Sequence, residues 1–188
     1  MLINVYDFDN TIYRGDSSVD FFRHCAAKYP RAYWSVLAAS PWLLAMALGL
    51  ADKTRVKQRI YRYLRCVPDV REEVERFWLT HDGNLKDWYF AQKREDDLII
   101  SASPEFLLEP LMRRLGLRLI ASRVDAGTGV YEGLNCHGEE KVRRMREAYP
   151  AVQIDGFYSD SRSDAPLAKL ARQAYLVKGD AISPFPPD

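Results

Sequence analysis

Two aspartates, Asp7 and Asp9, end an apolar run near the start of the chain, in the stretch "INVYDFDNT". Because side chains alternate along a strand, both carboxylates are expected on one face and Phe8 on the other. Carboxylates that lie so close repel each other unless a cation or a proton offsets their charge. The pair therefore predicts a site that also contains a cation.

Three later segments supply residue types that would complete such a site: "SAS" at 101–103, "GEEK" at 138–141 and "SDSRSD" at 159–164. The candidates in the four segments are Asp7, Asp9, Thr11, Ser101, Ala102, Lys141, Asp160 and Asp164. Carboxylate oxygens favour a hard cation, and Mg²⁺ combines a few of them with water and substrate phosphate. A serine hydroxyl, the backbone N–H after it and a lysine ammonium are groups that bind phosphate. The set predicts Mg²⁺ as cofactor and a phosphate ligand.

The elements that must position these residues follow from the hydrophobic pattern. Residues 2–8 predict a buried strand, 17–94 predict four or five helices without a strand, and strand and helix patterns alternate from 97 onward. The later strands are expected at 97–103, 117–122, 154–160 and 174–177, with helices at 104–116, from 138 and at 164–171, and a hairpin at 127–133. Such alternation predicts an α/β fold with a mainly parallel sheet, whose ligands bind beyond the carboxyl ends of the strands. Residues 1–15 and 96–188 are expected to form the core, and 16–95 a helical insertion after the first strand.

The four segments, in this order and at these intervals, resemble the motifs of the haloacid dehalogenase superfamily, in its phosphoserine-phosphatase-like branch. The resemblance implies a Rossmann-like core with an all-helical cap, and a Mg²⁺-dependent phosphomonoester hydrolase that forms an aspartyl phosphate. It implies that Asp7 is the nucleophile and that Asp9 donates a proton to the leaving alcohol and accepts one from water. It further implies substrate binding by Thr11, Ser101, Ala102 and Lys141, and metal binding by Asp7, the main-chain carbonyl of Asp9, Asp160 and Asp164.

The substrate remains open among several classes. Phosphoserine phosphatases and phosphomutases of the superfamily also keep both aspartates of the first motif. Phosphoserine phosphatases usually carry glycines where this chain reads "SASPEF", and a glutamate at the position of Asp16. The layout, including "NCHGEEKV", resembles more closely the bacterial phosphatidylglycerophosphate phosphatases of this branch. The expected substrate is a phospholipid head-group phosphate or a small phosphometabolite.

Residues 32–51 carry no charged side chain, and this uncharged segment is long enough to cross a membrane. A single crossing here would put the strands that carry Asp7 and Ser101 on opposite sides of the bilayer, so the favoured prediction is the apolar interior of the helical cap. The alternative is a hairpin, broken near Pro41, that lies on a membrane. The basic run that follows would suit an anionic surface, so 32–65 is the candidate for a peripheral membrane contact. No nucleic-acid-binding motif accompanies these charges.

The composition and charge of the chain limit the classes of protein to which it could belong. The chain has 188 residues, of which 47% are hydrophobic, and this fits a protein with a globular core. Its formal net charge of +1 indicates no particular class of partner. Its three cysteines are widely spaced and its three histidines scattered, so zinc has little support and a reducing, cytoplasmic setting is expected. The first residues predict a strand rather than a signal peptide, and the last, "SPFPPD", a loose tail. A non-catalytic phosphate-binding protein and a membrane-surface protein are the alternatives from other classes.

Overall fold

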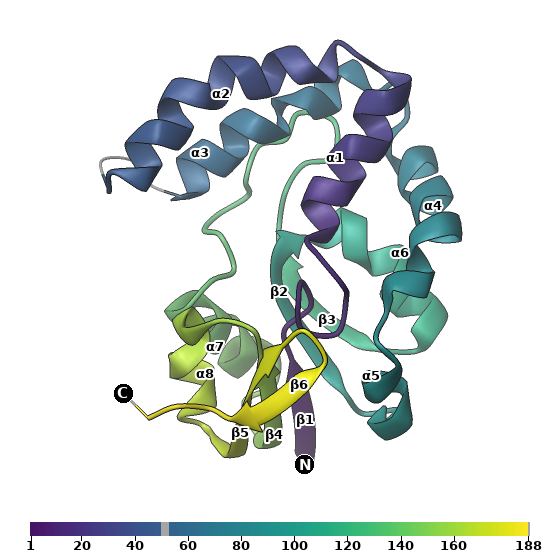
Figure 1. Ribbon diagram of the computed structural model, residues 1–188. Coiled ribbons are helices and arrows are strands. Elements are labelled where there is room, and N and C mark those ends of the chain that lie inside the picture. Colours follow the sequence, from purple (N-terminus) through teal and green to yellow (C-terminus); the bar gives the residue numbers. More distant parts are fainter. Residues whose placement is uncertain (50–52, 188) are drawn as a thin grey trace.

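The central strand of the protein is β1 (Leu2–Tyr6), the strand that carries the first pair of aspartates. The computed structural model describes residues 1–49 and 53–187, within which the strands form a six-stranded sheet in the order β3-β2-β1-β4-β5-β6 (Figure 1). The other strands are β2 (Leu98–Pro104), β3 (Arg118–Ser122), β4 (Gln153–Ser159), β5 (Ala171–Lys178) and β6 (Ala181–Pro184). Strands β1 to β5 pair in parallel, and β6 runs antiparallel to β5. The predicted α/β fold with a mainly parallel sheet is confirmed.

Helices cover both faces of the sheet, which explains why β1 is apolar on both sides. Ile3 and Val5 pack in the cluster formed with α7 (Glu139–Ala148) and α8 (Ala165–Ala168). Tyr6 and Phe8 point the opposite way, into the cluster formed with α4, α5 and α6. The bounds of these helices are Val70–His81 for α4, Asp87–Gln92 for α5 and Glu105–Leu115 for α6. Asp7, between Tyr6 and Phe8, lies where the strand ends.

In its described part, the chain between β1 and β2 contains helices joined by turns and isolated bridges and no regular strand, as predicted. This helical insertion comprises α1 (Ser17–Lys28), α2 (Ala32–Ala47), α3 (Lys53–Ile60), the 3₁₀ helix η1 (Tyr61–Cys66), α4, the 3₁₀ helix η2 (Asp82–Asn84) and α5. The carboxylate of Asp16 accepts hydrogen bonds from the first turn of α1, and that of Asp69 from α4, so each helix begins at a capping aspartate. Helices α2 and α3 lie beyond the carboxyl ends of the strands, whereas α4 returns along the core beside α6 (Figure 1).

The insertion and the sheet share one hydrophobic cluster. Phe8 of the sheet edge stacks on Tyr13 with ring centroids 5.5 Å apart, and meets Trp78 of α4 edge-on at 6.1 Å. Trp78 is fully buried, and its indole N–H donates to the carbonyl oxygen of Leu107 in α6 at 2.6 Å. The turn that follows β1 is therefore packed against both parts of the molecule.

The described part of residues 32–51 is not an apolar interior, so the favoured prediction for it is wrong. Ala32 and Ala39 are buried, but Trp34 is 71% exposed and Leu37 59%. Two small residues let α2 approach its neighbours α3 and η1, while Trp34 and Leu37 between them face outward. Residues 50 and 51 of this segment lie outside the described residues. Within residues 1–49 and 53–187, no helix is both long and apolar enough to cross a bilayer.

The carboxyl-terminal stretch differs from the expected loose tail, because β6 pairs with the free edge of β5. The backbone N–H of Phe185 donates to the carbonyl oxygen of Ala174 at 2.8 Å, and the ring of Phe185 lies 6.4 Å from that of Phe157. The helix expected at 164–171 is shorter, since α8 ends at Ala168 and β5 begins at Ala171. Strand pairing therefore determines both where α8 ends and how the carboxyl-terminal residues are placed.

The glycine-rich stretch 127–133 forms a loop with one isolated antiparallel bridge, Val124 to Tyr131, in place of the expected regular hairpin. The loop rises from β3 to the helical insertion (Figure 1). A Cβ atom at Gly129 would lie 2.4 Å from the carbonyl oxygen of Tyr61 in η1, so only glycine allows this close approach. The core and the insertion are thus in direct contact through this loop.

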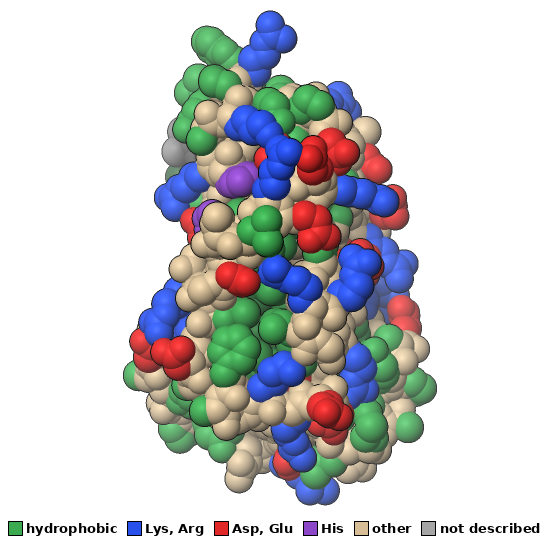
Figure 2. Space-filling model, turned by 90° about the vertical axis from the view of Figure 1, so that its right-hand side faces the viewer, with side chains coloured by type: hydrophobic (Ala, Val, Ile, Leu, Met, Phe, Trp, Pro, Cys, Tyr) green, Lys and Arg blue, Asp and Glu red, His purple; other side chains and the backbone are tan. Residues whose placement is uncertain are grey.

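The face formed by α4, α5 and α6 carries acidic and basic side chains side by side (Figure 2). Arg76 of α4 pairs with Glu72 at 2.5 Å and with Glu73 at 3.0 Å. Pairs of this spacing stabilise an exposed helix surface locally. This face has the mixed charge of an ordinary solvated surface.

Candidate active site

A cavity of about 160 Å³ lies where the carboxyl ends of β1, β2 and β4 meet. The predicted site residues that line it are Asp7, Asp9, Ser101, Ala102, Lys141, Asp160 and Asp164. Residues separated by more than 130 positions thus meet at one point, as expected for the edge of a parallel sheet. Thr11 is the one predicted residue that does not line the cavity.

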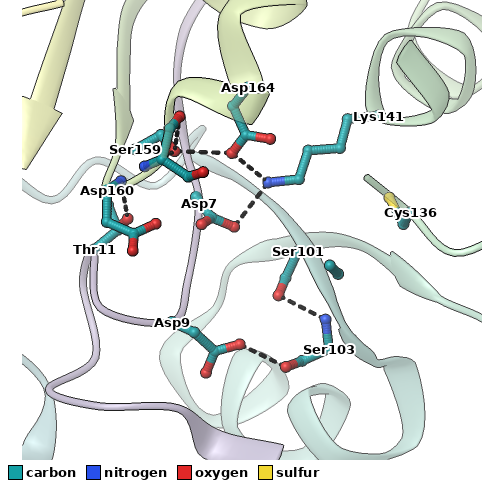
Figure 3. A network of polar contacts seen from close by, with 12 residues as sticks. Asp7, Asp9, Thr11, Ser101, Ser103, Cys136, Lys141, Ser159, Asp160 and Asp164 are labelled. Atoms are coloured by element: carbon teal, nitrogen blue, oxygen red, sulfur yellow. Dashed lines mark hydrogen bonds and ion pairs between the residues drawn. The ribbon is translucent and has the colours of Figure 1, made fainter. Parts of the chain in front are cut away.

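The ammonium of Lys141 lies between two carboxylates. Its Nζ is 2.8 Å from Oδ1 of Asp7 and 2.7 Å from Oδ2 of Asp164 (Figure 3). Ser159 Oγ donates a further hydrogen bond to Asp164 Oδ2 at 2.8 Å. Burial raises the pKa of Asp7, and the Lys141 charge acts against that rise. Burial alone would lower the pKa of Lys141, but Asp7 and Asp164 raise it above its ordinary value, so this lysine is charged.

Helix α7 holds Lys141 in place. The helix begins after Gly138, whose φ of +58° favours glycine, and Lys141 lies in its first turn. Glu140 binds Arg143 and Arg144, and these guanidinium groups lower the pKa of Glu140 to about 2 despite its burial. Arg144 also donates to the carbonyl oxygen of Ala121 in β3 at 2.7 Å. Arg144 therefore fixes the helix to the sheet three residues after the lysine, and Glu140 holds that guanidinium in place.

The carboxylate of Asp9 lines the same cavity, but its hydrogen-bond partners differ from those of the ion-paired group. Asp9 Oδ2 accepts a hydrogen bond from Ser103 Oγ at 2.5 Å (Figure 3). Asp9 Oδ1 accepts one from the backbone N–H of Ser17 at 2.6 Å. Burial and the charge of Asp16 raise the pKa of Asp9 to about 6. A carboxyl group with a pKa near neutrality suits proton transfer in both directions.

The turn after β1 presents Asp7 and Asp9 to the cavity. The carbonyl oxygen of Phe8 accepts hydrogen bonds from the backbone N–H groups of residues 11, 12 and 13. Asn10 adopts a φ of +57°, a left-handed conformation that asparagine tolerates better than most residues. The buried ammonium of Lys86 donates to the carbonyl oxygen of Asn10 at 2.6 Å. The backbone of this turn is thus fixed from several sides.

Thr11 lies beneath the cavity rather than on its surface. Its side chain is fully buried, and its Oγ1 accepts a hydrogen bond from the backbone N–H of Asp160 at 2.9 Å. The hydroxyl therefore joins the turn after β1 to the end of β4. The prediction of substrate binding gives way to a positioning role, in which Thr11 sets the place of Asp160.

Ser101 and Ser103 extend the site from the end of β2. Ser101 Oγ accepts a hydrogen bond from the backbone N–H of Ser103 at 3.0 Å, and Ser103 Oγ also contacts Ser18 Oγ at 3.0 Å. Ser103 lies in the predicted segment 101–103 but was not among the candidate site residues. Its position two residues after Ser101, on the same face of an extended strand, is the signal that would have placed it beside Asp9.

Lys57 and His137 also line the cavity, and sequence reasoning assigned neither to it. Lys57 reaches the cavity from α3, and its place in a run of basic residues gave no sign of this position. Desolvation lowers the pKa of Lys57, while Asp16 acts against that shift. The helical insertion thus contributes a second cationic side chain to the cavity.

A hard cation fits the remaining oxygen atoms. Asp164 Oδ1 is buried without a hydrogen-bond partner, and the carboxylates of Asp7 and Asp160 lie close by (Figure 3). Among the described residues, no three histidine, cysteine or acidic side chains converge closely enough to form a metal site by themselves. A cation here would therefore need main-chain, water or substrate oxygens as well, which is the coordination that Mg²⁺ prefers.

The sequence of the protein matches the family of haloacid dehalogenase-like hydrolases over residues 5–169. The chain belongs to this family. The prediction of a haloacid dehalogenase-type hydrolase is therefore confirmed, and the four motif segments fall inside or at the border of the matched region.

Known proteins similar to this haloacid dehalogenase-like hydrolase include phosphatases. Protein CicA of Caulobacter vibrioides is 30% identical over 189 aligned positions, covering 90% of this chain and 83% of CicA. The phosphoserine phosphatase SerB1 of Mycobacterium tuberculosis is 28% identical, covering 94% of this chain and 64% of SerB1. A crystal structure of a protein of unknown function from Bordetella pertussis Tohama I has a TM-score of 0.72 at 21% identity, covering 92% of this chain and 88% of that one. This last likeness concerns the fold.

Proposed function

We propose that this haloacid dehalogenase-like hydrolase cleaves phosphomonoesters, with Asp7 as nucleophile and Mg²⁺ as cofactor. The observation that carries the proposal is the separation of the two aspartates of the first motif. Asp7 is paired with a buried ammonium at 2.8 Å, whereas Asp9 is held by a serine hydroxyl and a backbone N–H and has a pKa of about 6. One carboxylate is thus arranged to carry charge and the other to exchange a proton.

The reaction would proceed in two displacements. Asp7 Oδ attacks phosphorus, the bond from phosphorus to the ester oxygen breaks, and Asp9 protonates the departing alcohol. Asp9 then takes a proton from a water molecule, whose oxygen attacks the aspartyl phosphate and releases Asp7 and inorganic phosphate. Ser101 and the backbone N–H of Ala102 would bind phosphoryl oxygens together with Lys141.

The carboxylates of Asp7, Asp160 and Asp164, with the main-chain carbonyl of Asp9, would hold Mg²⁺. The ion would neutralise charge on the phosphoryl oxygens and hold them in line with the nucleophile. The unpartnered Oδ1 of Asp164 supports this assignment. We also propose that residues 16–95 act as the cap of a core formed by 1–15 and 96–188, because Asp16 and Lys57 of this segment line the catalytic cavity.

A screen of phosphomonoesters with and without Mg²⁺ tests the proposal. The set includes phosphoserine, sugar phosphates, nucleotides and phosphatidylglycerophosphate in detergent, and phosphate release is measured. We expect at least one substrate to be hydrolysed, activity to disappear with a chelator, and added Mg²⁺ to restore it. Binding of phosphate without turnover of any ester would support a non-catalytic binding protein instead, and transfer to a second hydroxyl of the substrate would support a phosphomutase.

We further propose that α2 and α3 contact an anionic membrane surface, as a second and separate property. Exposed Trp34 and Leu37 project from α2, and the guanidinium of Arg59 lies 3.9 Å from the ring centre of Trp42. A cavity of about 460 Å³ beside them is lined by Arg31, Trp34, Arg59 and Arg62 among others. Aromatic side chains next to arginines suit the interface between lipid head groups and acyl chains.

Flotation with liposomes tests this contact. We expect the protein to float with vesicles that contain an anionic phospholipid and not with neutral ones, and Leu37→Ser to reduce the floating fraction several-fold. Leu79→Ser is the matched control, because Leu79 is 71% exposed on α4, outside this surface. Equal flotation of both variants, or none for the wild type, would rule out this surface and leave the protein in the cytoplasm without a membrane contact.

A further inference from the structure

A third cavity, of about 630 Å³, is lined by residues of the helical insertion and takes no part in the chemistry described above. It is partly open to solvent and is lined by Asp16 and by side chains of α1, α2, α3 and η1. Its apolar lining includes Phe22, Val36, Val56, Ile60 and Tyr63. Val56 and Tyr63 are buried, so part of the wall is firmly packed rather than a feature of loose surface side chains.

This apolar cavity adjoins the catalytic cavity, because the two share lining residues. Two residues, Asp16 and Lys57, line both spaces and therefore stand at the junction between them. The pair places one negative and one positive side chain between the oxygen atoms around Asp7 and the apolar wall. A molecule bound with its phosphate at Asp7 would extend past this junction into the insertion.

The wall of the apolar cavity is tied to the residue that we propose as proton donor. Tyr61, which lines the cavity, donates a hydrogen bond to Ser18 Oγ at 3.2 Å. Ser18 Oγ contacts Ser103 Oγ at 3.0 Å, and Ser103 in turn donates to Asp9. The ring of Tyr61 stacks on Tyr131 of the core loop, with centroids 6.1 Å apart. An occupant of the cavity would thus lie against the same assembly that holds Asp9.

The size and lining of the cavity indicate what it can hold. Its volume lies within the range of about 300–1,000 Å³ that is typical of sites for small molecules. At about 30 Å³ for each non-hydrogen atom, it has room for roughly twenty such atoms. Apolar walls favour an alkyl chain or an aromatic ring over a sugar or an amino acid, whose polar groups would lose hydrogen bonds to water there.

We propose that this cavity binds the apolar part of the leaving alcohol, so that the substrate is a phosphomonoester of an alcohol with an alkyl chain or aromatic ring. The inference rests on the proposed hydrolysis at Asp7 and adds the substrate class. Val36, Ile60 and Phe22 are then residues that determine specificity. Lys57 lines both cavities, so its side chain would lie beside a substrate that occupies them.

A series of monoalkyl phosphates from methyl to octyl, below the concentrations at which they aggregate, tests the substrate class. We expect kcat/KM to rise by about threefold to fourfold for each added methylene, the factor that corresponds to burying one such group. The rise is expected to stop when the chain fills the cavity. Efficient hydrolysis of the short esters with no dependence on chain length would contradict the proposed apolar pocket. The proposed phosphatase function would still hold.

Two variants separate this pocket from the general stability of the insertion. Val36→Trp fills the cavity, so kcat/KM for octyl phosphate is expected to fall at least tenfold while that for methyl phosphate stays within about twofold. Ile60→Asn makes the lining polar and is expected to flatten the chain-length series. Leu79→Trp introduces the same side chain as Val36→Trp on an exposed face of α4, outside the cavity, and is expected to leave the series unchanged. Equal behaviour of Val36→Trp and Leu79→Trp would contradict the proposal.

Binding provides a readout that does not depend on turnover. Calorimetric titration of the Asp7→Asn protein with the same alkyl phosphates should show affinity that grows with chain length, and Val36→Trp in that background should abolish the growth. If no ester is hydrolysed by the wild type, the hydrolytic function fails, while chain-length-dependent binding still supports the pocket. Affinity independent of chain length overturns the pocket in either case.

Discussion

Replacing Asp7 with asparagine is expected to reduce kcat by at least about a thousandfold without unfolding the protein. The amide has nearly the same shape as the carboxylate but cannot attack phosphorus, and removing a nucleophile typically removes most of the chemical acceleration. The fold is expected to persist because Lys141 keeps its ion pair with Asp164 at 2.7 Å. Steady-state phosphate release measures the loss, and thermal unfolding with circular dichroism measures the fold.

Asp155→Asn is the matched control for this change. Asp155 lies in β4, its side chain is 40% exposed, and it is absent from the catalytic cavity. The control should retain wild-type kcat and the same melting temperature within a few degrees. Retention of more than a few per cent of activity in Asp7→Asn would refute Asp7 as the nucleophile, whatever substrate is used.

The sequence was informative about the site because its residues follow strand ends. The topology of a parallel sheet brings such positions to one edge, so Asp7, Ser101 and Asp160 could be predicted as neighbours before any distance was known. Lys141 could be added because the resemblance to a family supplies its place in the motif order. The same reasoning predicted the fold class, since the alternation of strands and helices admits few other topologies.

Other features depend on the direction of single side chains, which spacing does not determine. Thr11 follows Asp9 by two residues, yet the tight turn at Phe8 carries its hydroxyl beneath the cavity to the backbone of Asp160. Lys57 is one of several basic residues on α3, and only the packing of α3 over the sheet edge makes it part of the cavity. The apolar composition of α2 likewise predicts burial. A helix that few neighbours cover, however, is buried on one side and exposed on the other.

The apolar cavity could not have been predicted from sequence for a related reason. Its lining comes from α1, α2, α3 and η1, and each contributes residues that would be interpreted as ordinary core positions. Whether such residues meet or enclose a space depends on how the helices pack, not on their hydrophobic pattern. The proposed role of this space rests on its position beside the catalytic cavity, with which it shares Asp16 and Lys57.

Replacing Lys141 with methionine is expected to abolish activity and to destabilise the protein by about 3–5 kcal/mol, the usual cost of removing one partner of a buried ion pair. Methionine preserves most of the volume of the side chain, so the loss reports on charge rather than on a cavity. Lys141 is only 2% exposed, and the carboxylates of Asp7 and Asp164 would be left buried without the cation that now contacts both. Urea unfolding in the presence of a chelator measures the change, and Lys93→Met at the end of α5 controls for the substitution itself.

The double variant Lys141→Met/Asp164→Asn distinguishes electrostatic from steric destabilisation. Removing one of the two unpaired charges should restore part of the lost free energy of unfolding, while phosphate release stays absent because the ammonium that would neutralise the phosphoryl oxygens is still missing. Contacting residues in one network are expected to deviate from additivity in this way. Additive losses in the double variant would mean that the lysine stabilises the fold through packing, and the view of Lys141 as the cation that makes these neighbouring carboxylates tolerable would have to be abandoned.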